Sequence, residues 1–213
     1  MSVAGPAPSV AVVDYGAGNL VSIEQALMTA GARVRRAVEA AEIGDADLLV
    51  VPGVGAAAPA MDRLRAGGFV DPLRGWIAAD RPFLGICLGL QLLFEGSDED
   101  GAETLGILPG RTVRLDGAPT LPHIGWNQVE RRREDPAFAG IAPGAEFYFV
   151  HSYVAAPAGP DGEAAVLAET GHGTRFVSAV ARGRLLAVQF HPERSGADGL
   201  RFIANVVAGL GAA

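Results

Sequence analysis

Residues 83–91 read Phe83-Leu84-Gly85-Ile86-Cys87-Leu88-Gly89-Leu90-Gln91. The first residues form a short apolar run typical of a buried strand, and those after the cysteine are typical of a helix. The G-x-C-x-G pattern is the cysteine form of a nucleophile elbow, in which the nucleophile occupies a tight turn between strand and helix. Gly85 and Gly89 lack a Cβ, which lets the two backbones approach closely. The segment therefore predicts a nucleophile at Cys87.

Cys87 is the single cysteine of the chain, so it can form neither an internal disulfide nor a Cys-based metal cluster. A helix that begins beyond it would point free N–H groups and the positive end of its dipole at the sulfur, which favours the thiolate. A lone cysteine in a tight turn can equally be an inert, buried residue. The presence of a second residue that can transfer protons would distinguish these interpretations.

Short apolar segments alternate with helix-like segments through the first half of the chain. The expected strands are 10–14, 47–51 and 83–86, and the expected helices are 20–29, 57–66, 69–79 and 88–95. This alternation predicts a parallel α/β sheet. Later strands at 147–154, 176–181 and 185–190, a hairpin through Arg182-Gly183-Arg184 and a final helix at 200–207 follow. We therefore expect a mixed, mostly parallel sheet flanked by helices, with an antiparallel extension.

Length and composition favour one soluble domain. The chain has 213 residues, of which 49% are hydrophobic, and we expect a single domain over residues 10–213. Residues 1–9 are expected to be a flexible tail, since they match neither a secretory signal nor a transit peptide. The apolar stretches break before the roughly 20 residues of a membrane span. We therefore expect a cytoplasmic protein that makes no membrane contact.

The charge balance disfavours nucleic-acid binding. A formal charge of -7 and a pI near 5.1 repel phosphate backbones. The densest basic cluster, Arg131-Arg132-Arg133, is followed at once by Glu134 and Asp135. No nucleic-acid partner is expected.

His191 is the candidate proton shuttle among the four histidines. It ends the expected strand 185–190, and sites in open α/β sheets form at the carboxyl ends of strands. Pro192 cannot continue a strand ladder, and in an extended segment Glu193 would lie on the same side as His191 and could hold the imidazole. Taken singly, His191 could be satisfied by backbone and Glu193 could be a solvated charge. With Cys87 they predict a Cys-His-Glu triad.

These features together resemble the class I, or triad, glutamine amidotransferases, in which a G-x-C-x-G elbow is completed by a distant H-P-E. Further motifs are similar to those of the glutaminase subunits of imidazole glycerol phosphate synthases. These motifs are Asp14-Tyr15-Gly16-Ala17-Gly18-Asn19, Pro52-Gly53-Val54-Gly55, Pro122-His123-Ile124-Gly125-Trp126-Asn127 and Phe149-Val150-His151-Ser152-Tyr153. The resemblance covers nearly the whole chain and implies a three-layer, flavodoxin-like fold.

The resemblance implies that glutamine and water give glutamate and ammonia, without metal or organic cofactor. Cys87 would form a γ-glutamyl thioester, and His191, held by Glu193, would protonate ammonia and then activate water. The oxyanion hole would use the N–H of Leu88 and a donor from the loop at Gly53 and Val54, in which a peptide can rotate. The expected substrate-binding residues are Gly55, Gln91, Glu99, Ser152 and Tyr153.

The resemblance also implies a partner. The ammonia would pass to a (β/α)8-barrel synthase/cyclase subunit in a heterodimer of histidine biosynthesis. Asn19, Trp126 and Tyr148 match positions near the docking face, and Trp126 could alternatively pack in the core. Arg194 replaces the usual Lys at an interface position and Leu90 replaces a common Met, and a changed ion pair at Arg194 would follow. His123, His151 and His172 receive no chemical role.

Other functions remain open at this stage. The chain could serve another amidotransferase, for example in anthranilate, carbamoyl phosphate or guanylate synthesis, with the same Cys87 chemistry. It could be a γ-glutamyl peptidase of the same fold, or a catalytically silent module that retains the fold. The motifs at 122–127 and 149–153 disfavour the first alternative, the absence of added domains disfavours the second, and the intact triad disfavours the third.

Overall fold

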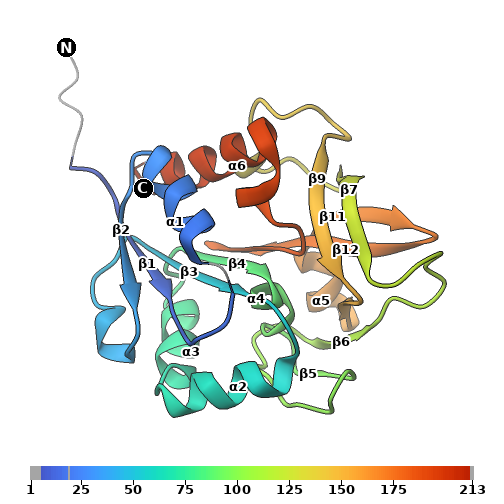
Figure 1. Cartoon of the computed structure of the whole chain (residues 1–213), viewed down its shortest axis with the longest axis horizontal. Helices are drawn as coiled ribbons and strands as arrows, with labels where there is room; N and C mark the ends of the chain where they lie inside the picture. Colours follow the sequence, from blue (N-terminus) through green and yellow to red (C-terminus); the bar gives the residue numbers. More distant parts are fainter. Residues whose placement is uncertain (1–5, 19, 212–213) are drawn as a thin grey trace.

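A central sheet organises the computed structural model, which describes residues 6–18 and 20–211. Its first part is parallel throughout and has the strand order β2-β1-β3-β4-β13 (Figure 1). The strands are β2 (Arg33–Ala37), β1 (Ser9–Val13), β3 (Leu48–Gly53), β4 (Phe83–Cys87) and β13 (Leu185–Val188). Every residue of β3 and β4 is buried, as expected for parallel strands with both faces covered.

Helices cover both faces of this sheet, which confirms the three-layer α/β fold. Figure 1 shows α1 (Leu20–Thr29) and α6 (Gly196–Ala208) on one face and α2 (Ala57–Ala66) and α3 (Val70–Ala78) on the other. The core is divided accordingly: one apolar cluster contains the buried residues of α2 and α3, and a second contains those of α1 and α6. In α3, Trp76 is buried and donates from Nε1 to the Pro82 carbonyl at 2.8 Å.

An antiparallel extension continues the sheet beyond β13, as predicted. The expected hairpin is present, since β12 pairs with β13 and Arg182 lies opposite Leu185. The sheet then continues to β10, β6 and β5, while β11 and β8 pair outside this path. The bounds are β12 (Thr174–Arg182), β10 (Tyr153–Pro157), β6 (Gly110–Arg114), β5 (Gly96–Ser97), β11 (Val166–His172) and β8 (Glu130–Arg131).

The predicted strand at 147–154 is wrong as a single element. The chain divides at Ser152 into β9 (Glu146–His151) and β10. β9 leaves the main sheet and pairs with β7 (His123–Gln128) in a two-stranded antiparallel ribbon. A division at one residue lets a single apolar run serve two sheets, and the run itself carries no signal for it.

Other boundaries differ from the predictions. The expected helix at 88–95 contains only α4 (Leu88–Gln91), strand 185–190 ends at Val188, and α6 begins before residue 200. Ser9, placed in the predicted tail, belongs to β1, and residues 1–5 of that tail lie outside the described residues. The remaining elements are α5 (Gly159–Ala165) and 3₁₀ turns at Ala40–Glu42, Pro136–Phe138, Pro192–Arg194 and Gly209–Gly211.

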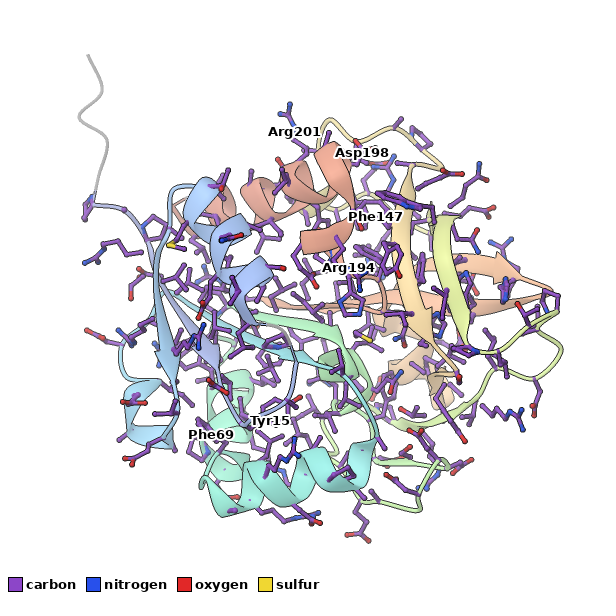
Figure 2. The ribbon with its side chains drawn as sticks, viewed as in Figure 1. Tyr15, Phe69, Phe147, Arg194, Asp198 and Arg201 are labelled. Carbon is purple, nitrogen blue, oxygen red and sulfur yellow. The ribbon has the colours of Figure 1, made fainter. Side chains whose placement is uncertain are left out.

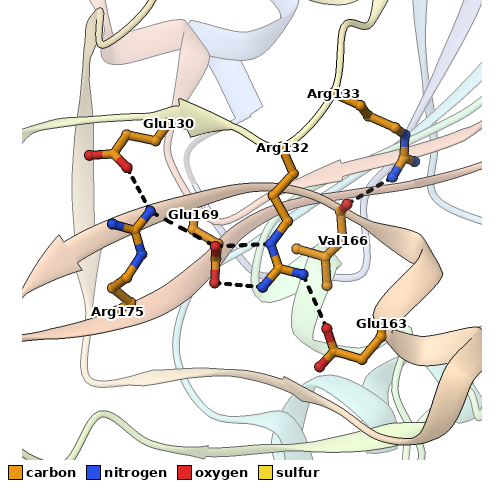
Figure 3. Close-up of polar contacts among 7 residues, drawn as sticks. All are labelled: Glu130, Arg132, Arg133, Glu163, Val166, Glu169 and Arg175. Atoms are coloured by element: carbon orange, nitrogen blue, oxygen red, sulfur yellow. Dashed lines mark hydrogen bonds and ion pairs between the residues drawn. The ribbon is translucent and has the colours of Figure 1, made fainter.

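The basic cluster at 131–133 is held by the protein itself. Figure 3 shows Arg132 between Glu169, which it contacts from Nε and Nη2 at 2.9 Å each, and Glu163 at 3.1 Å. Arg133 donates to the carbonyls of Ala164, Val166 and Ala181 at 3.1, 2.8 and 2.8 Å. These contacts tie the segment after β8 to β11, β12 and α5. The guanidinium groups of Arg132 and Arg133 are therefore engaged in contacts within the protein.

Candidate active site

Cys87 occupies the carboxyl end of β4, which lies between β3 and β13 in the parallel part of the sheet. Gly53 of β3 lies opposite Cys87 on one side, and on the other side Val188 of β13 pairs with Ile86. Cys87 has φ +55°, which is rare for a residue with a side chain. Such backbone strain is typical of functional sites. The side chain is 5% exposed.

The two glycines of the elbow are required sterically. A Cβ on Gly89 would lie 1.9 Å from the Val51 carbonyl oxygen, and one on Gly85 would lie 2.8 Å from the Gly89 carbonyl oxygen. Both distances are shorter than real Cβ contacts. Strand β3 and the turn after Cys87 therefore approach as closely as the G-x-C-x-G pattern predicted.

The short α4 changes the expected electrostatics at Cys87. A helix dipole is the sum of aligned peptide dipoles, and α4 contains only four residues. A helix does begin directly after Cys87, as predicted, but it is shorter than predicted and its dipole is correspondingly smaller. The positive charge available to the sulfur is that of the neighbouring imidazole of His191.

His191 and Glu193 form a buried pair beside Cys87. The Nδ1 atom of His191 lies 2.8 Å from Oε1 of Glu193, and because a carboxylate only accepts, Nδ1 carries the proton. The Nε2 atom of His191 has no hydrogen-bond partner among residues 6–18 and 20–211. The sequence predicted that an extended segment would bring the two residues together. This is wrong, because Pro192–Arg194 is a 3₁₀ turn. The turn brings the two side chains together instead.

The pKa of His191 is raised well above its ordinary value. Burial alone would lower it, but the negative charges of Cys87 and Glu193 outweigh burial. An imidazolium held between a thiolate and a carboxylate is the state that these charges favour. The arrangement can therefore keep a proton on His191 close to the sulfur at neutral pH.

A cavity of about 450 Å³ opens in front of Cys87. All five predicted substrate-binding residues line it, namely Gly55, Gln91, Glu99, Ser152 and Tyr153, and so does Val54 of the predicted oxyanion hole. Arg194, predicted at the partner interface, lines it as well, and so do the unpredicted Ala56, Pro122, Val150 and His151. Burial and the neighbouring Asp100 raise the pKa of Glu99. The cavity is large enough for an amino acid, and its wall includes the thiol of Cys87.

The side chain of Tyr15 packs against the loop at 52–55. The hydroxyl of the buried Tyr15 donates to the Pro52 carbonyl at 3.0 Å, and a Cβ on Gly53 would lie 2.1 Å from that hydroxyl. Gly55 has φ +90°. Glycine at both positions is thus imposed by space or by backbone conformation, and the loop runs directly beside Cys87 and Leu88.

Gln91 is engaged with the protein through its amide nitrogen. Nε2 donates to the Tyr153 carbonyl at 2.8 Å and to Oε1 of Gln189 at 3.1 Å. Among residues 6–18 and 20–211 no donor contacts the amide oxygen of Gln91, which leaves that atom for a ligand. Gln189 was not predicted, although a polar residue in the apolar run before His191 was an available signal. Its Nε2 lies 3.6 Å from Sγ of Cys87.

The predicted interface residues that the structure describes lie together on the outer face of the β7–β9 ribbon. Trp126 is 53% exposed and lies opposite Tyr148, with ring centroids 6.3 Å apart. The guanidinium carbon of Arg194 lies 4.2 Å from the centroid of the Tyr148 ring, and Figure 2 shows Arg194 close to β9. Trp126 is therefore not a core residue. Asn19 lies outside the described residues.

The three histidines without an assigned role form a cluster that reaches the cavity wall at His151. His123 Nδ1 lies 3.1 Å from His151 Nε2, and the rings of His123 and His172 stack with centroids 4.0 Å apart. Asn127 Nδ2 contacts the other nitrogen of His123 at 3.1 Å. Burial lowers the pKa of His123 to about 4 and that of His151 to about 3. These two imidazoles are neutral at physiological pH.

Comparison with known proteins identifies the family. The model of the glutamine amidotransferase class-I family matches residues 11–208. The chain belongs to this family. A protein named imidazole glycerol phosphate synthase subunit HisH from Synechococcus sp. strain JA-3-3Ab is 49% identical over 201 residues, with 92% of each chain covered. One of the same name from Syntrophotalea carbinolica is 44% identical over 205 residues, covering 92% of this chain and 98% of the relative.

Solved structures agree with the amidotransferase fold. PurLQS from Thermotoga maritima has a TM-score of 0.75 at 16% identity and covers 96% of this chain and 99% of its own. A crystal structure of a glutamine amidotransferase has a TM-score of 0.71 at 21% identity, covering 93% of this chain and 98% of its own. The predicted fold and family are confirmed. No helix among the described residues of this amidotransferase combines the length and the apolar character that crossing a bilayer requires.

Proposed function

We propose that this amidotransferase is the glutaminase subunit of an imidazole glycerol phosphate synthase in histidine biosynthesis. The observation that carries the proposal is the placement of Cys87 on the wall of the cavity, with the His191–Glu193 pair beside it. The substrate is L-glutamine and the products are glutamate and ammonia. The high identity to HisH subunits over nearly the whole chain supports the choice among amidotransferases.

Glutamine would enter with its side-chain amide toward Cys87. Glu99 is the carboxylate that lines the cavity and would meet the α-ammonium group. The free oxygen of the Gln91 amide would accept a further hydrogen bond from that group. Backbone at Gly55, Ser152 and Tyr153 completes the pocket. Binding in this orientation holds the carboxamide carbon within reach of the sulfur.

The reaction would then follow two steps. The Cys87 thiolate attacks the carboxamide carbon of glutamine, and the C–N bond breaks as His191 gives its proton to the leaving ammonia. A γ-glutamyl thioester remains on Cys87. Neutral His191 next removes a proton from water, which attacks the thioester carbon and releases glutamate and the thiolate. Glu193 keeps the Nε2 atom of His191 directed at these groups throughout.

The oxyanion would be stabilised by backbone donors on either side of Cys87. The N–H of Leu88 supplies one, and a peptide at Gly53 and Val54 supplies the other after rotation. Loss of one such donor costs about 3–4 kcal/mol of transition-state stabilisation. A rotation governed by the partner would prevent glutamine hydrolysis when no ammonia acceptor is bound.

The partner would be a (β/α)8-barrel synthase/cyclase subunit, bound as a heterodimer over the ribbon face. This face consists of Ile124, Trp126, Tyr148 and Val150, with Arg194 alongside. Ile124 is 59% exposed, and Val150 and Arg194 also line the cavity, so a protein bound there would cover its mouth. Ammonia could then pass directly into the barrel. We assign the reaction to the cytoplasm, where a reactive free thiol stays reduced, and residues 10–213 to a single domain.

The test is glutamate release from glutamine by wild type and Cys87→Ala, with and without the barrel partner and its ribonucleotide ligand. We expect Cys87-dependent turnover that rises at least tenfold when both are present. Ser178→Ala, a buried side chain outside the cavity, serves as the control and should behave as wild type. A rate of glutamine hydrolysis that is the same with and without this partner would indicate that the protein serves another amidotransferase. Glutamine hydrolysis by Cys87→Ala would overturn the proposed reaction mechanism.

A further inference from the structure

Gln189 lies against the reacting sulfur but outside the cavity. It follows β13 directly and is next in register to Cys87, because Val188 pairs with Ile86. Its Nε2 atom is 3.6 Å from Sγ of Cys87, and the side chain is fully buried. His191 follows two residues later, after a bend at residues 189–190, and the charge of Cys87 acts on its imidazole. Two nitrogen-bearing side chains from the segment that follows β13 therefore lie near the sulfur.

The orientation of the Gln189 amide is fixed by its neighbours. The Tyr153 carbonyl can only accept a hydrogen bond, so the atom of Gln91 that lies 2.8 Å from it must be nitrogen. The same nitrogen lies 3.1 Å from the amide of Gln189, which must therefore present its oxygen there. The nitrogen of Gln189 is left facing Cys87. An amide nitrogen donates and does not accept, so it can stabilise a thiolate.

We infer that Gln189 is a positioning residue that holds the Cys87 thiolate toward the cavity, as the last member of a chain from the Tyr153 carbonyl through Gln91. The inference rests on the proposed function and deepens it. The opposing group is the Val150 carbonyl oxygen, 4.0 Å from Sγ, which can accept a hydrogen bond only from the neutral thiol. Without the Gln189 donor, the surroundings on that side favour the thiol.

The hydrogen-bonded series from Tyr153 to Gln189 also gives Gln91 a second role. Its nitrogen connects a cavity-wall carbonyl to the amide of Gln189, while its oxygen remains free. Movement of the backbone at Tyr153 would be transmitted to the sulfur through two amides. The titratable or charged groups that surround Cys87 are His191 and Glu193 from the turn after β13, Tyr15 from the loop after β1, His151 from β9, and Glu99 and Arg194 at the cavity.

The experiment measures alkylation of Cys87 by iodoacetamide against pH, in the isolated protein without glutamine. Gln189→Met keeps the length of the side chain and removes the donor. We expect the pH of half-maximal alkylation to rise by about one unit, which is a tenfold slower reaction below that pH. With glutamine, partner and ligand, kcat should fall about tenfold and KM should stay within about twofold, because Gln189 does not line the cavity.

Two further variants make the outcome decisive. Gln91→Met leaves Gln189 in place but removes its clamp, so the alkylation profile should move in the same direction by less, and the double variant should match Gln189→Met alone. Ser178→Ala, whose hydroxyl has no hydrogen-bond partner in the described part of the chain, should keep the wild-type profile. If Gln189→Met does not fold, Gln91→Met carries the test.

An alkylation profile of folded Gln189→Met that coincides with wild type would overturn the inference, whatever happens to kcat. The same holds for an unshifted Gln91→Met profile if that variant has to stand alone. Because alkylation requires neither glutamine nor partner, a shifted profile in a protein that does not hydrolyse glutamine would support the role of Gln189 and overturn the proposed function instead. The two failures are therefore distinguishable.

Discussion

The Glu193 carboxylate contacts one nitrogen of His191 and leaves the other without a partner in the described residues. Glu193→Gln removes the negative charge that helps to raise the pKa of His191. We expect less imidazolium at neutral pH and a fall in glutaminase kcat of about 100-fold. The positive charge on His191 should also be lost at lower pH than in wild type. Steady-state rates between pH 6 and 9 measure both effects.

Glu134→Gln is the matched control for this change. Glu134 lies at the surface, 87% exposed, and pairs with Arg131 at 3.5 Å. Its loss should leave kcat and its pH dependence as in wild type. A wild-type rate in Glu193→Gln would show that the carboxylate does not orient or charge the imidazole.

Gly89→Ala tests the close approach at the elbow. The added Cβ would lie 1.9 Å from the Val51 carbonyl oxygen, and relief requires β3 or the turn after Cys87 to move. We expect a loss of at least about 3 kcal/mol in the free energy of unfolding, measured by urea denaturation. Gly75→Ala in α3 is the control, because nothing lies within 4 Å of its new Cβ. It should stabilise the protein by about 0.5–1 kcal/mol, and equal effects of the two changes would contradict the steric argument.

At the scale of elements, Arg133 connects three segments through their backbones. Its guanidinium donates to carbonyls before β11, at the start of β11 and near the end of β12. Arg133→Met keeps much of the apolar stem and removes these donors, so we expect a loss of about 1–2 kcal/mol in the free energy of unfolding. Arg114→Met, which removes an exposed pair with Asp116 at 4.0 Å, should change it by less than about 0.5 kcal/mol. Similar urea midpoints for the two variants would show that the three carbonyls are satisfied by solvent.

Elements that bury apolar residues on a regular period were the ones predictable from sequence. Helices α1 and α2 have the predicted bounds, and the fully apolar β3 and β4 are displaced by no more than two residues. Strand β2 was missed because its sequence, RVRRA, is mostly charged and it lies at an edge of the sheet. Helix α4 was predicted too long because residues 92–94 are apolar and were expected to continue the helix. These residues are instead buried after the helix has ended.

The sequence could predict those site residues whose type and local motif indicate their chemistry. The elbow and the H-P-E segment locate Cys87, His191 and Glu193 before any geometry is known. Gln189 was not found, because its role depends on a register between β13 and β4 that only the folded sheet creates. The same limit applies to the 3₁₀ turn at Pro192–Arg194, which brings His191 to Glu193 by a route other than the predicted one.

At the scale of the whole molecule, buried neutral histidines make stability depend on pH. His151 has a pKa of about 3 when folded, against an ordinary value of 6.5, and that of His123 is about 4. Their contribution is complete above pH 6.5 and is lost as the pH falls toward the folded values, because the unfolded chain binds protons first. His191 has a raised pKa, so its contribution is complete below pH 6.5 and is lost on the alkaline side.

We therefore expect the free energy of unfolding to fall below pH 6.5, with His151 contributing up to about 1.4 kcal/mol per pH unit and His123 less. Urea denaturation at pH 7, 6 and 5 measures this slope. In His123→Leu the free energy of unfolding should change less steeply with pH, whatever its value at pH 7. A slope that is flat between pH 7 and 5 would mean that the buried histidines can be protonated in the folded protein.

The chain has two tryptophans, and they occupy opposite environments. Trp76 is 4% exposed, with the guanidinium carbon of Arg81 3.4 Å from its ring centroid, whereas Trp126 is 53% exposed on the ribbon face. Their fluorescence should therefore separate into a fraction that iodide quenches and a fraction that it does not reach. Any protein that covers the ribbon face would shift the quenchable fraction to shorter wavelength and protect it. The protein thus carries an intrinsic optical reporter of the surface beside its active site, and no label has to be introduced to follow its occupation.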